Sequence, residues 1–346
     1  MARKYFARAN TSSGCINLIE NNLSGMNVCS IGGRSKSAKS KLMKTAAGYF
    51  EAKGMKAEYI VSPFDIKRYD AVIIRDVKFA MADSELLGKN PDTDTDSCLR
   101  IRSLEISEDY MEELEKRADC GYEGLYNAYG RAKQIHDEWE KIYIDNMDFE
   151  RMNLYSTETI GRIIKTGVES RAGTRMERFF GASTMDGSVN YIDNLTEGLE
   201  RRYFIKGRPG TGKSTFLKKL AKAAETAGYD TEVYYCSFDK NSLDMVLVPE
   251  LGMCVFDSTA PHEMFPNREN DEILDFYTEA GLIGVDEKFE KQLEHIKRKY
   301  SFRIFEGMAN LRLASGFDME REYYLERITD CDELARTADK LVRRVM

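Results

Sequence analysis

A loop with the composition of a phosphate-binding site lies in the second half of the chain. Residues 207–215 read Gly-Arg-Pro-Gly-Thr-Gly-Lys-Ser-Thr. The order G-x-x-x-x-G-K-[ST] is typical of loops that wrap the phosphates of a nucleoside triphosphate. Gly207, Gly210 and Gly212 lack side chains, so successive backbone N–H groups can turn toward a phosphate chain at the start of a helix. The pattern predicts that this loop binds ATP or a related nucleotide.

The loop also predicts the position of a magnesium ion. Lys213 is expected to reach the β- and γ-phosphates, and the Ser214 hydroxyl is the expected Mg²⁺ ligand. Asp257 ends the apolar run 253–256, 44 residues after Lys213, and is the candidate to hold the metal or its water. A plain aspartate at the end of a strand is the competing interpretation. All nine loop residues are predicted nucleotide contacts: Gly207, Arg208, Pro209, Gly210, Thr211, Gly212, Lys213, Ser214 and Thr215.

Two further side chains are candidates for chemistry near this loop. Asp239 directly follows an expected strand, where it could face the γ-phosphate or an acceptor, although Asp also readily caps the turn at residues 241–242. His262 follows Asp257 closely and could sense the γ-phosphate, contact a substrate or shuttle a proton. An incidental histidine in a surface turn explains its position equally well.

Apolar residues on either side of the loop predict the elements that position it. Tyr203, Phe204 and Ile205 form an expected strand before the loop. After the loop, apolar residues recur at helical spacing until Gly228, at Phe216, Leu217, Leu220, Ala224 and Ala227.

An internal repeat predicts that the same arrangement occurs twice. Residues 31–84 align without a gap with 205–258, and about 16 of the 54 positions are identical. The fold class is therefore predicted as α/β, with two duplicated P-loop NTPase-like domains, each a mainly parallel sheet flanked by helices. Residues 1–170 would form one domain with a helical extension at about 105–165, and residues 171–346 the other, with an extension at about 286–346.

The two predicted loops differ at positions where a side chain matters. The first copy keeps Lys39, Ser40 and Asp83, but has Lys36 and Ala38 where the second has glycines. Side chains at these positions would impose strain or block phosphate oxygens. A weak or empty first site is expected, and residual binding remains an alternative.

Composition limits the partners of the chain. The net charge is −7, with 51 basic and 58 acidic residues, so no general attraction to nucleic acid or to acidic membranes is expected. The seven cysteines show no C-x-x-C spacing, and no apolar run is long enough to predict a membrane span. A cytoplasmic protein with reduced thiols is expected.

Long charged stretches with helical periodicity follow both predicted cores. Residues 122–143 carry an aromatic and apolar stripe at three- and four-residue spacing, and residues 289–300 carry another. Such stripes are typical of core packing or of contacts between domains. They also leave open a protein partner bound through the helical extensions.

Several segments together resemble a known family. They are F-F-G-A-S-T from residue 179, the loop at 207, C-S-F-D-K-N-S-L-D from 236, D-S-T-A-P-H from 257 and I-H-D-E-W-E from 135. Over nearly its whole length the chain resembles tandem P-loop ATP-binding proteins of Gram-positive bacteria, which are described only as ATPases or nucleotide-kinase-like. The resemblance implies a nucleotide site at residues 207–215 and no defined substrate.

Three functions are compatible with these features. The first is Mg²⁺-dependent ATP binding and hydrolysis at the second copy, although Ser258 stands where a water-activating Glu often follows the strand Asp. The second is a kinase that transfers the γ-phosphoryl group to a nucleoside, nucleotide or small metabolite, with Asp239 as the base. The third is a slow nucleotide-dependent switch that binds a protein partner.

Overall fold

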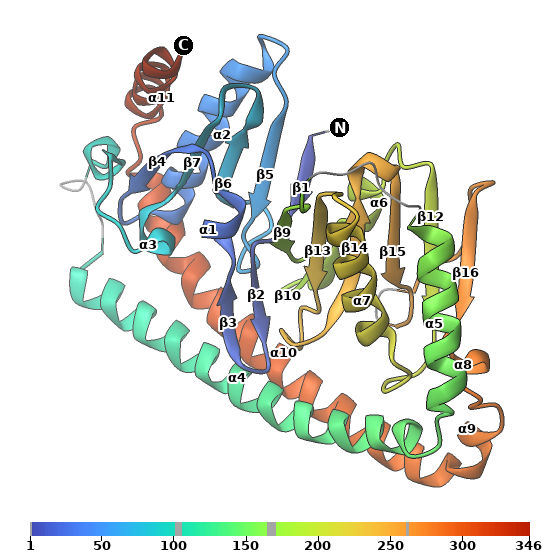
Figure 1. The fold of residues 1–346 in the computed structure, drawn as a ribbon. Coiled ribbons are helices and arrows are strands. Elements are labelled where there is room, and N and C mark those ends of the chain that lie inside the picture. The colour runs from blue at the N-terminus through green and yellow to red at the C-terminus, as the bar shows by residue number, and fades with distance from the viewer. Residues whose placement is uncertain (1, 101–105, 165–170, 261–262) are drawn as a thin grey trace.

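The computed structural model describes residues 2–100, 106–164, 171–260 and 263–346. Two six-stranded sheets stand side by side over a pair of long helices (Figure 1). The first sheet has the strand order β1-β5-β6-β7-β4-β8. Its strands are β1 (Arg3–Tyr5), β4 (Asn27–Gly32), β5 (Ala57–Val61), β6 (Tyr69–Ile74), β7 (Phe79–Asp83) and β8 (Thr93–Asp94).

The second sheet repeats this order. It runs β9-β13-β14-β15-β12-β16 when read from the corresponding edge. Its strands are β9 (Arg175–Arg178), β12 (Arg201–Lys206), β13 (Thr231–Tyr235), β14 (Leu243–Val248), β15 (Met253–Asp257) and β16 (Asp271–Asp275). The α/β class and the duplication of the sheet are therefore confirmed.

Both sheets are mixed rather than purely parallel. Strands β6 and β14 run antiparallel to both of their neighbours, while the other pairings are parallel. A short 3₁₀ turn links β6 to β7 and another links β14 to β15, which is why these consecutive strands can pair as neighbours. Helix α2 (Lys36–Glu51) follows β4, and α7 (Lys213–Thr226) follows β12.

The two halves meet along their N-terminal hairpins. Hairpin β2–β3 (Arg8–Thr11, Gly14–Asn17) in the first half corresponds to β10–β11 (Gly181–Thr184, Gly187–Asn190) in the second. Between them, Phe6 and Phe179 exchange backbone hydrogen bonds of 3.0 and 2.9 Å, and both side chains are fully buried. One antiparallel bridge thus joins equivalent residues of the two copies.

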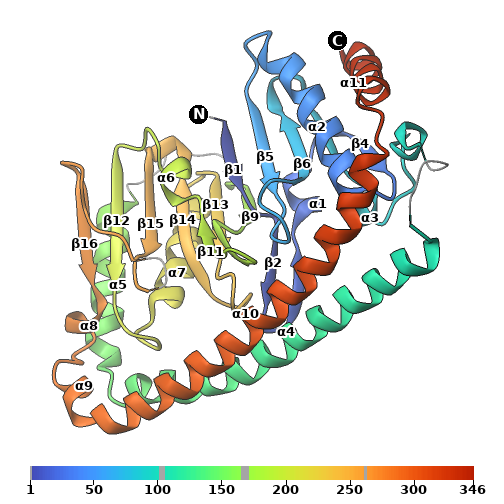
Figure 2. The same ribbon diagram turned by 180° about the vertical axis from the view of Figure 1, so that it is seen from behind.

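Two long helices run antiparallel beneath both sheets, as the reverse view shows (Figure 2). They are α4 (Glu108–Ile144) and α10 (Glu290–Arg327). A Cβ atom on Gly121 of α4 would lie 2.8 Å from the Cβ atom of Ala314 on α10, so glycine permits the close approach. The helix predicted from the stripe at 122–143 is confirmed, with Leu125, Tyr129 and Tyr143 buried.

Each long helix leads into a shorter helix that packs on the other half. Met152 and Ile163 of α5 (Phe149–Ile163) belong to the apolar core of the second half. Leu334 and Leu341 of α11 (Cys331–Val345) belong to the core of the first half. The predicted boundary at residues 170 and 171 falls at the edge of 165–170, outside the described residues, and remains a prediction.

Short helices complete the fold. They are α1 (Ile19–Asn22), α3 (Ser84–Leu87), α6 (Ile192–Leu195), α8 (Phe276–Glu279) and α9 (Val285–Lys288). Across the described ranges, none of the helices combines the length and the apolar character needed to cross a lipid bilayer.

Candidate functional site

The loop at residues 207–212 connects the end of β12 to the start of α7, as the sequence predicts. Gly210 and Gly212 have φ angles of +79° and +83°, which L residues with side chains rarely adopt. Gly212 is the N-cap of α7. Thr211 is buried and its hydroxyl donates to the carbonyl of Arg208 at 2.9 Å, which holds the turn closed on itself. The backbone N–H groups of the first turn of α7, which have no acceptor within the helix, therefore lie at the end of this loop.

Three of the predicted residues lie together beside the loop. Strands β12 and β15 are parallel neighbours, with Ile205 opposite Asp257. Lys213 Nζ lies 3.5 Å from Asp257 Oδ2 and donates to the carbonyl of Arg208 at 2.9 Å. The Ser214 hydroxyl accepts a hydrogen bond of 2.9 Å from the backbone N–H of Leu243. This hydrogen bond fixes the oxygen while leaving its other lone pair for a ligand.

A second carboxyl group, which the sequence interpretation missed, stands opposite Asp257. The register of β14 and β15 pairs Met245 with Phe256, so the next pair outward is Asp244 and Asp257. Opposite residues of an antiparallel pair direct their side chains to the same face of the sheet. Burial, reinforced by the negative charge of Asp257, raises the pKa of the Asp244 carboxyl to about 7. Two acids and one lysine thus converge at this edge of the sheet.

The first copy contains the same pair of acids with an added cation. Asp70 and Asp83 are the counterparts of Asp244 and Asp257. Arg8 donates to both oxygens of Asp70, at 2.8 and 2.7 Å, and its charge also reaches Asp83. The counterpart of Arg8 in the second copy is Gly181, in the strand that matches β2. The repeat alignment, in which Asp70 and Asp244 are identical, was the signal that could have identified Asp244.

Helix α4 of the first half closes over the loop of the second half. A Cβ atom on Gly210 would lie only 2.5 Å from the backbone carbonyl oxygen of Glu140, so glycine is required for close approach as well as for its φ angle. Arg208 donates to Asp286 at 2.7 and 2.9 Å, and the Tyr143 hydroxyl donates to the same carboxylate at 2.7 Å. The side chain of Arg208 is therefore engaged by the helices and not by the interior of the loop.

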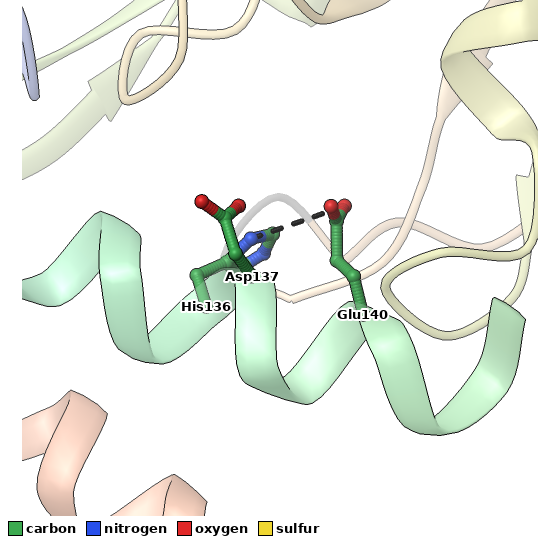
Figure 3. A group of neighbouring side chains, drawn as sticks. All are labelled: His136, Asp137 and Glu140. Atoms are coloured by element: carbon green, nitrogen blue, oxygen red, sulfur yellow. Dashed lines mark ion pairs between the residues drawn. The ribbon is translucent and has the colours of Figure 1, made fainter. Parts of the chain in front are cut away.

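His136, Asp137 and Glu140 point to the same side of α4 (Figure 3). Their ligand atoms lie within 4.8 Å of one another. Burial lowers the pKa of His136 and raises the pKa of Glu140, and the charges of Lys133, Asp239 and Lys213 act on both groups. Asp137 is exposed and bonded to Lys133, so we assign no metal to this group.

The remaining predicted residues have less specific positions. Asp239 accepts from the backbone N–H of Asn241 at 2.9 Å, as in the capping alternative, and also lies 3.3 Å from Lys133 Nζ on α4. Pro209 is half-buried in the loop and Thr215 is exposed on α7. His262 lies outside the described residues, so its three predicted roles remain predictions.

In the first copy, helix replaces the open loop. Helix α2 begins at Lys36, the counterpart of Gly210, whereas α7 begins three residues later in the repeat. The carboxylate of Glu322, from the far end of α10, accepts from the backbone N–H groups of Lys36 and Ser37 at 2.9 and 3.0 Å and from the Ser35 hydroxyl at 2.9 Å. A protein carboxylate thus occupies the anion-binding end of this helix.

The lysine and serine of the first copy are also satisfied internally. Lys39 is almost fully buried and pairs with Asp83 at 2.7 Å and with Glu85 at 3.1 Å. The Ser40 hydroxyl accepts from the backbone N–H of Tyr69 at 2.8 Å, as Ser214 does from Leu243. The serine contact is therefore the same in both copies, whereas Lys39 lies closer to its strand aspartate than Lys213 does and has a second carboxylate partner.

Comparison with known proteins identifies no relative. No family model, no curated protein and no solved structure matches the chain. The resemblance to tandem P-loop proteins accordingly remains a prediction, and the site has to be interpreted from its own geometry.

Proposed function

We propose that the second half of the chain binds ATP with Mg²⁺ at the loop 207–215 and hydrolyses it. One observation supports this proposal above the others. In the first copy, Arg8 binds the buried Asp70 carboxylate, and the Glu322 carboxylate accepts from backbone N–H groups at the start of α2. In the second copy Gly181 stands in place of Arg8, and among the described residues no carboxylate accepts from the corresponding N–H groups of the loop. A cation and an anion that arrive together, as in Mg·ATP, would complete the second copy in the same way.

The Mg²⁺ ion would be held by oxygen ligands at the edge of the second sheet. The Ser214 hydroxyl and the Asp257 carboxylate would bind it directly or through water, with Asp244 beside them. Carboxylate and hydroxyl oxygens are the ligands that Mg²⁺ prefers, and the donor set fits the ion. The bound ion would neutralise charge that develops on the β- and γ-phosphates.

The loop and Lys213 would bind the phosphate chain. Backbone N–H groups at the start of α7 would donate to an anion bound there, and the helix dipole favours negative charge at this end. Lys213 donates to the carbonyl of Arg208. Exchange of this neutral acceptor for a phosphate oxygen would strengthen the hydrogen bond, since bonds between charged groups are about twice as strong as neutral ones. These fixed groups would stabilise the transition state by position and charge.

A nucleotide-dependent switch is the second candidate, and the contact between α4 and the loop favours it. The backbone of α4 at Glu140 touches Gly210, and Arg208 is tied to Asp286 just before α10. Any movement of the loop on binding nucleotide would therefore act on both long helices. Tight binding with little turnover would support this candidate.

The test is ADP formation from Mg·ATP by the purified chain, with Lys213→Ala as the background. ADP formed without an acceptor would support hydrolysis. ADP formed only with a pool of nucleosides, nucleotides and small metabolites would support a kinase, with Asp239 as the next residue to change. Binding of a fluorescent ATP analogue without ADP in either condition would support the switch.

A further inference from the structure

The first copy shows where a carboxylate from a long helix is placed relative to the loop. Glu322 of α10 reaches the backbone N–H groups of Lys36 and Ser37, and Arg68 lies 4.0 Å from its carboxylate. The Glu322 side chain is buried. Because the loop of the first copy has become helix, this carboxylate rests directly on the amides.

Glu140 of α4 is the counterpart of Glu322 in the second copy. Asp148, eight residues after Glu140, is the N-cap of α5. Asp330, eight residues after Glu322, is the N-cap of α11. Both glutamates also lie at the same loop position, since the backbone of Glu140 lies beside Gly210 and the Glu322 carboxylate binds the N–H group of Lys36, the counterpart of Gly210. The repeat therefore extends through the crossing helices, and each helix carries one glutamate to the loop of the opposite half.

In the second copy this glutamate is on the turn of α4 whose backbone lies beside the loop. Its carboxylate lies 3.9 Å from His136 Nδ1, which is beyond hydrogen-bond distance, and the charge of Lys213 acts on it. The neighbouring acids are engaged otherwise. Asp239 and Asp137 contact Lys133, and Asp257 accepts from both the N–H and the hydroxyl of Thr259. Glu140, whose backbone lies beside Gly210 and whose carboxyl group is influenced by the charge of Lys213, thus has the weakest competing contacts among these acids.

We propose that Glu140 is the base that activates water for attack on the γ-phosphate of ATP. This inference rests on the proposed ATPase function. The Glu140 carboxylate takes a proton from water as the water oxygen bonds to the γ-phosphorus, and the bond from that phosphorus to the β,γ-bridging oxygen breaks. ADP leaves with the bridging oxygen, inorganic phosphate carries the water oxygen, and the proton passes from Glu140 to solvent. Ser258 stands where a water-activating glutamate often follows the strand aspartate. Glu140, from the first half of the chain, would take the role of that residue.

The test compares Glu140→Gln with Glu138→Gln. Glu138 is exposed on the same helix two residues away and serves as the matched control. General-base catalysis typically contributes about 10²–10⁴-fold, so Glu140→Gln should lower the rate of ADP formation by at least about 100-fold. It should bind a fluorescent ATP analogue with a Kd within about threefold of the wild-type value, because this change keeps the size of the side chain. Glu138→Gln should match the wild type in both measurements.

Three results would overturn the inference, and they differ from one another. If the Glu140→Gln variant formed ADP at the wild-type rate, this carboxylate would not be the base, and the ATPase proposal would remain intact. Loss of nucleotide binding along with turnover would assign Glu140 to binding or to the fold. If the wild type formed no more ADP than Lys213→Ala, the proposed function itself would fail, and the role of Glu140 with it.

Discussion

Asp70 and Asp244 are the same residue of the repeat in two electrostatic settings. Asp70 is held by both donor groups of Arg8, and the Arg8 side chain is 15% exposed. Asp244 is similarly buried and lies opposite Asp257, as Asp70 lies opposite Asp83, but glycine replaces the arginine. Asp244 is kept in the second copy although the arginine that pairs with Asp70 is not. It is a candidate for function, since an arginine partner does not explain its presence.

The substitutions Asp70→Asn and Asp244→Asn should therefore differ, the first acting mainly on stability and the second mainly on the Mg²⁺ requirement. Asp70→Asn leaves the Arg8 charge buried without its carboxylate and should lower the free energy of unfolding by about 3–5 kcal/mol. Asp244→Asn removes a buried acid without an arginine and should cost less than about 1 kcal/mol, but should raise the Mg²⁺ concentration for half-maximal ADP formation at least about tenfold. Urea denaturation and a Mg²⁺ titration measure the two effects. Equal losses of stability would show that Asp244 is purely structural.

At the scale of elements, the sequence predicted what depends on local spacing. The strand, loop and helix around residues 201–226 and the matching unit in the first copy follow from apolar periodicity and from the repeat. The crossing of the long helices could not be predicted, because a helical stripe says which face is buried and not which partner covers it. Glu140 and Glu322 therefore had no visible connection to the two loops, although Glu140 lies within a segment that the sequence had marked.

The contact between α4 and α10 depends on glycine at residue 121 but not at residue 316. A Cβ atom on Gly121 would lie 2.8 Å from the Cβ atom and 3.0 Å from the backbone nitrogen of Ala314, whereas one on Gly316 would meet nothing within 4 Å. Gly121→Ala should therefore lower the free energy of unfolding by about 1–2 kcal/mol, as overpacking exceeds the gain in helix propensity. Gly316→Ala should raise it by about 0.5–1 kcal/mol.

Urea denaturation of both variants tests this packing. Both residues are helical glycines in the same helix pair, so both substitutions change helix propensity by a similar amount. The difference in unfolding free energy between the two variants therefore measures the cost of the helix contact. If Gly121→Ala were as stable as Gly316→Ala, the two helices would not be as close as the structure places them.

For the whole molecule, a buried ionic cluster joins the two halves beside their sheets. Arg178 of the second half is almost fully buried, pairs with Glu232 at 2.8 Å and lies over the ring of Tyr5 from the first half. Arg3 of the first half donates to the same Glu232 carboxylate, and Glu58 lies 3.6 Å from Arg178. Since both halves contribute charges to one desolvated site, their association depends on the ionisation of Glu232.

Acid should weaken this junction in a defined pH range. Burial alone would raise the pKa of Glu232, but the charges of Arg178 and Arg3 outweigh it and lower the pKa from 4.5 to about 2. An acid with a lowered pKa stabilises the fold fully above its unfolded value, and this stabilisation is lost as the pH falls from about 4.5 toward 2. The shift corresponds to about 3 kcal/mol of unfolding free energy.

Urea denaturation of the wild type and of Glu232→Gln, from pH 7 to pH 3, measures this contribution. The variant should be less stable by several kcal/mol at pH 7, since two arginines lose a buried partner. The gap should narrow as the pH falls below about 4.5, because Glu232 takes up a proton in the unfolded wild-type chain while the folded chain keeps it ionised, and this proton uptake favours unfolding of the wild type alone. Asp271 has a similarly lowered pKa through Arg202, but it is present in both proteins and cancels from the difference. A gap that stayed constant down to pH 3 would mean that Glu232 joins the halves by shape and hydrogen bonding rather than by its charge.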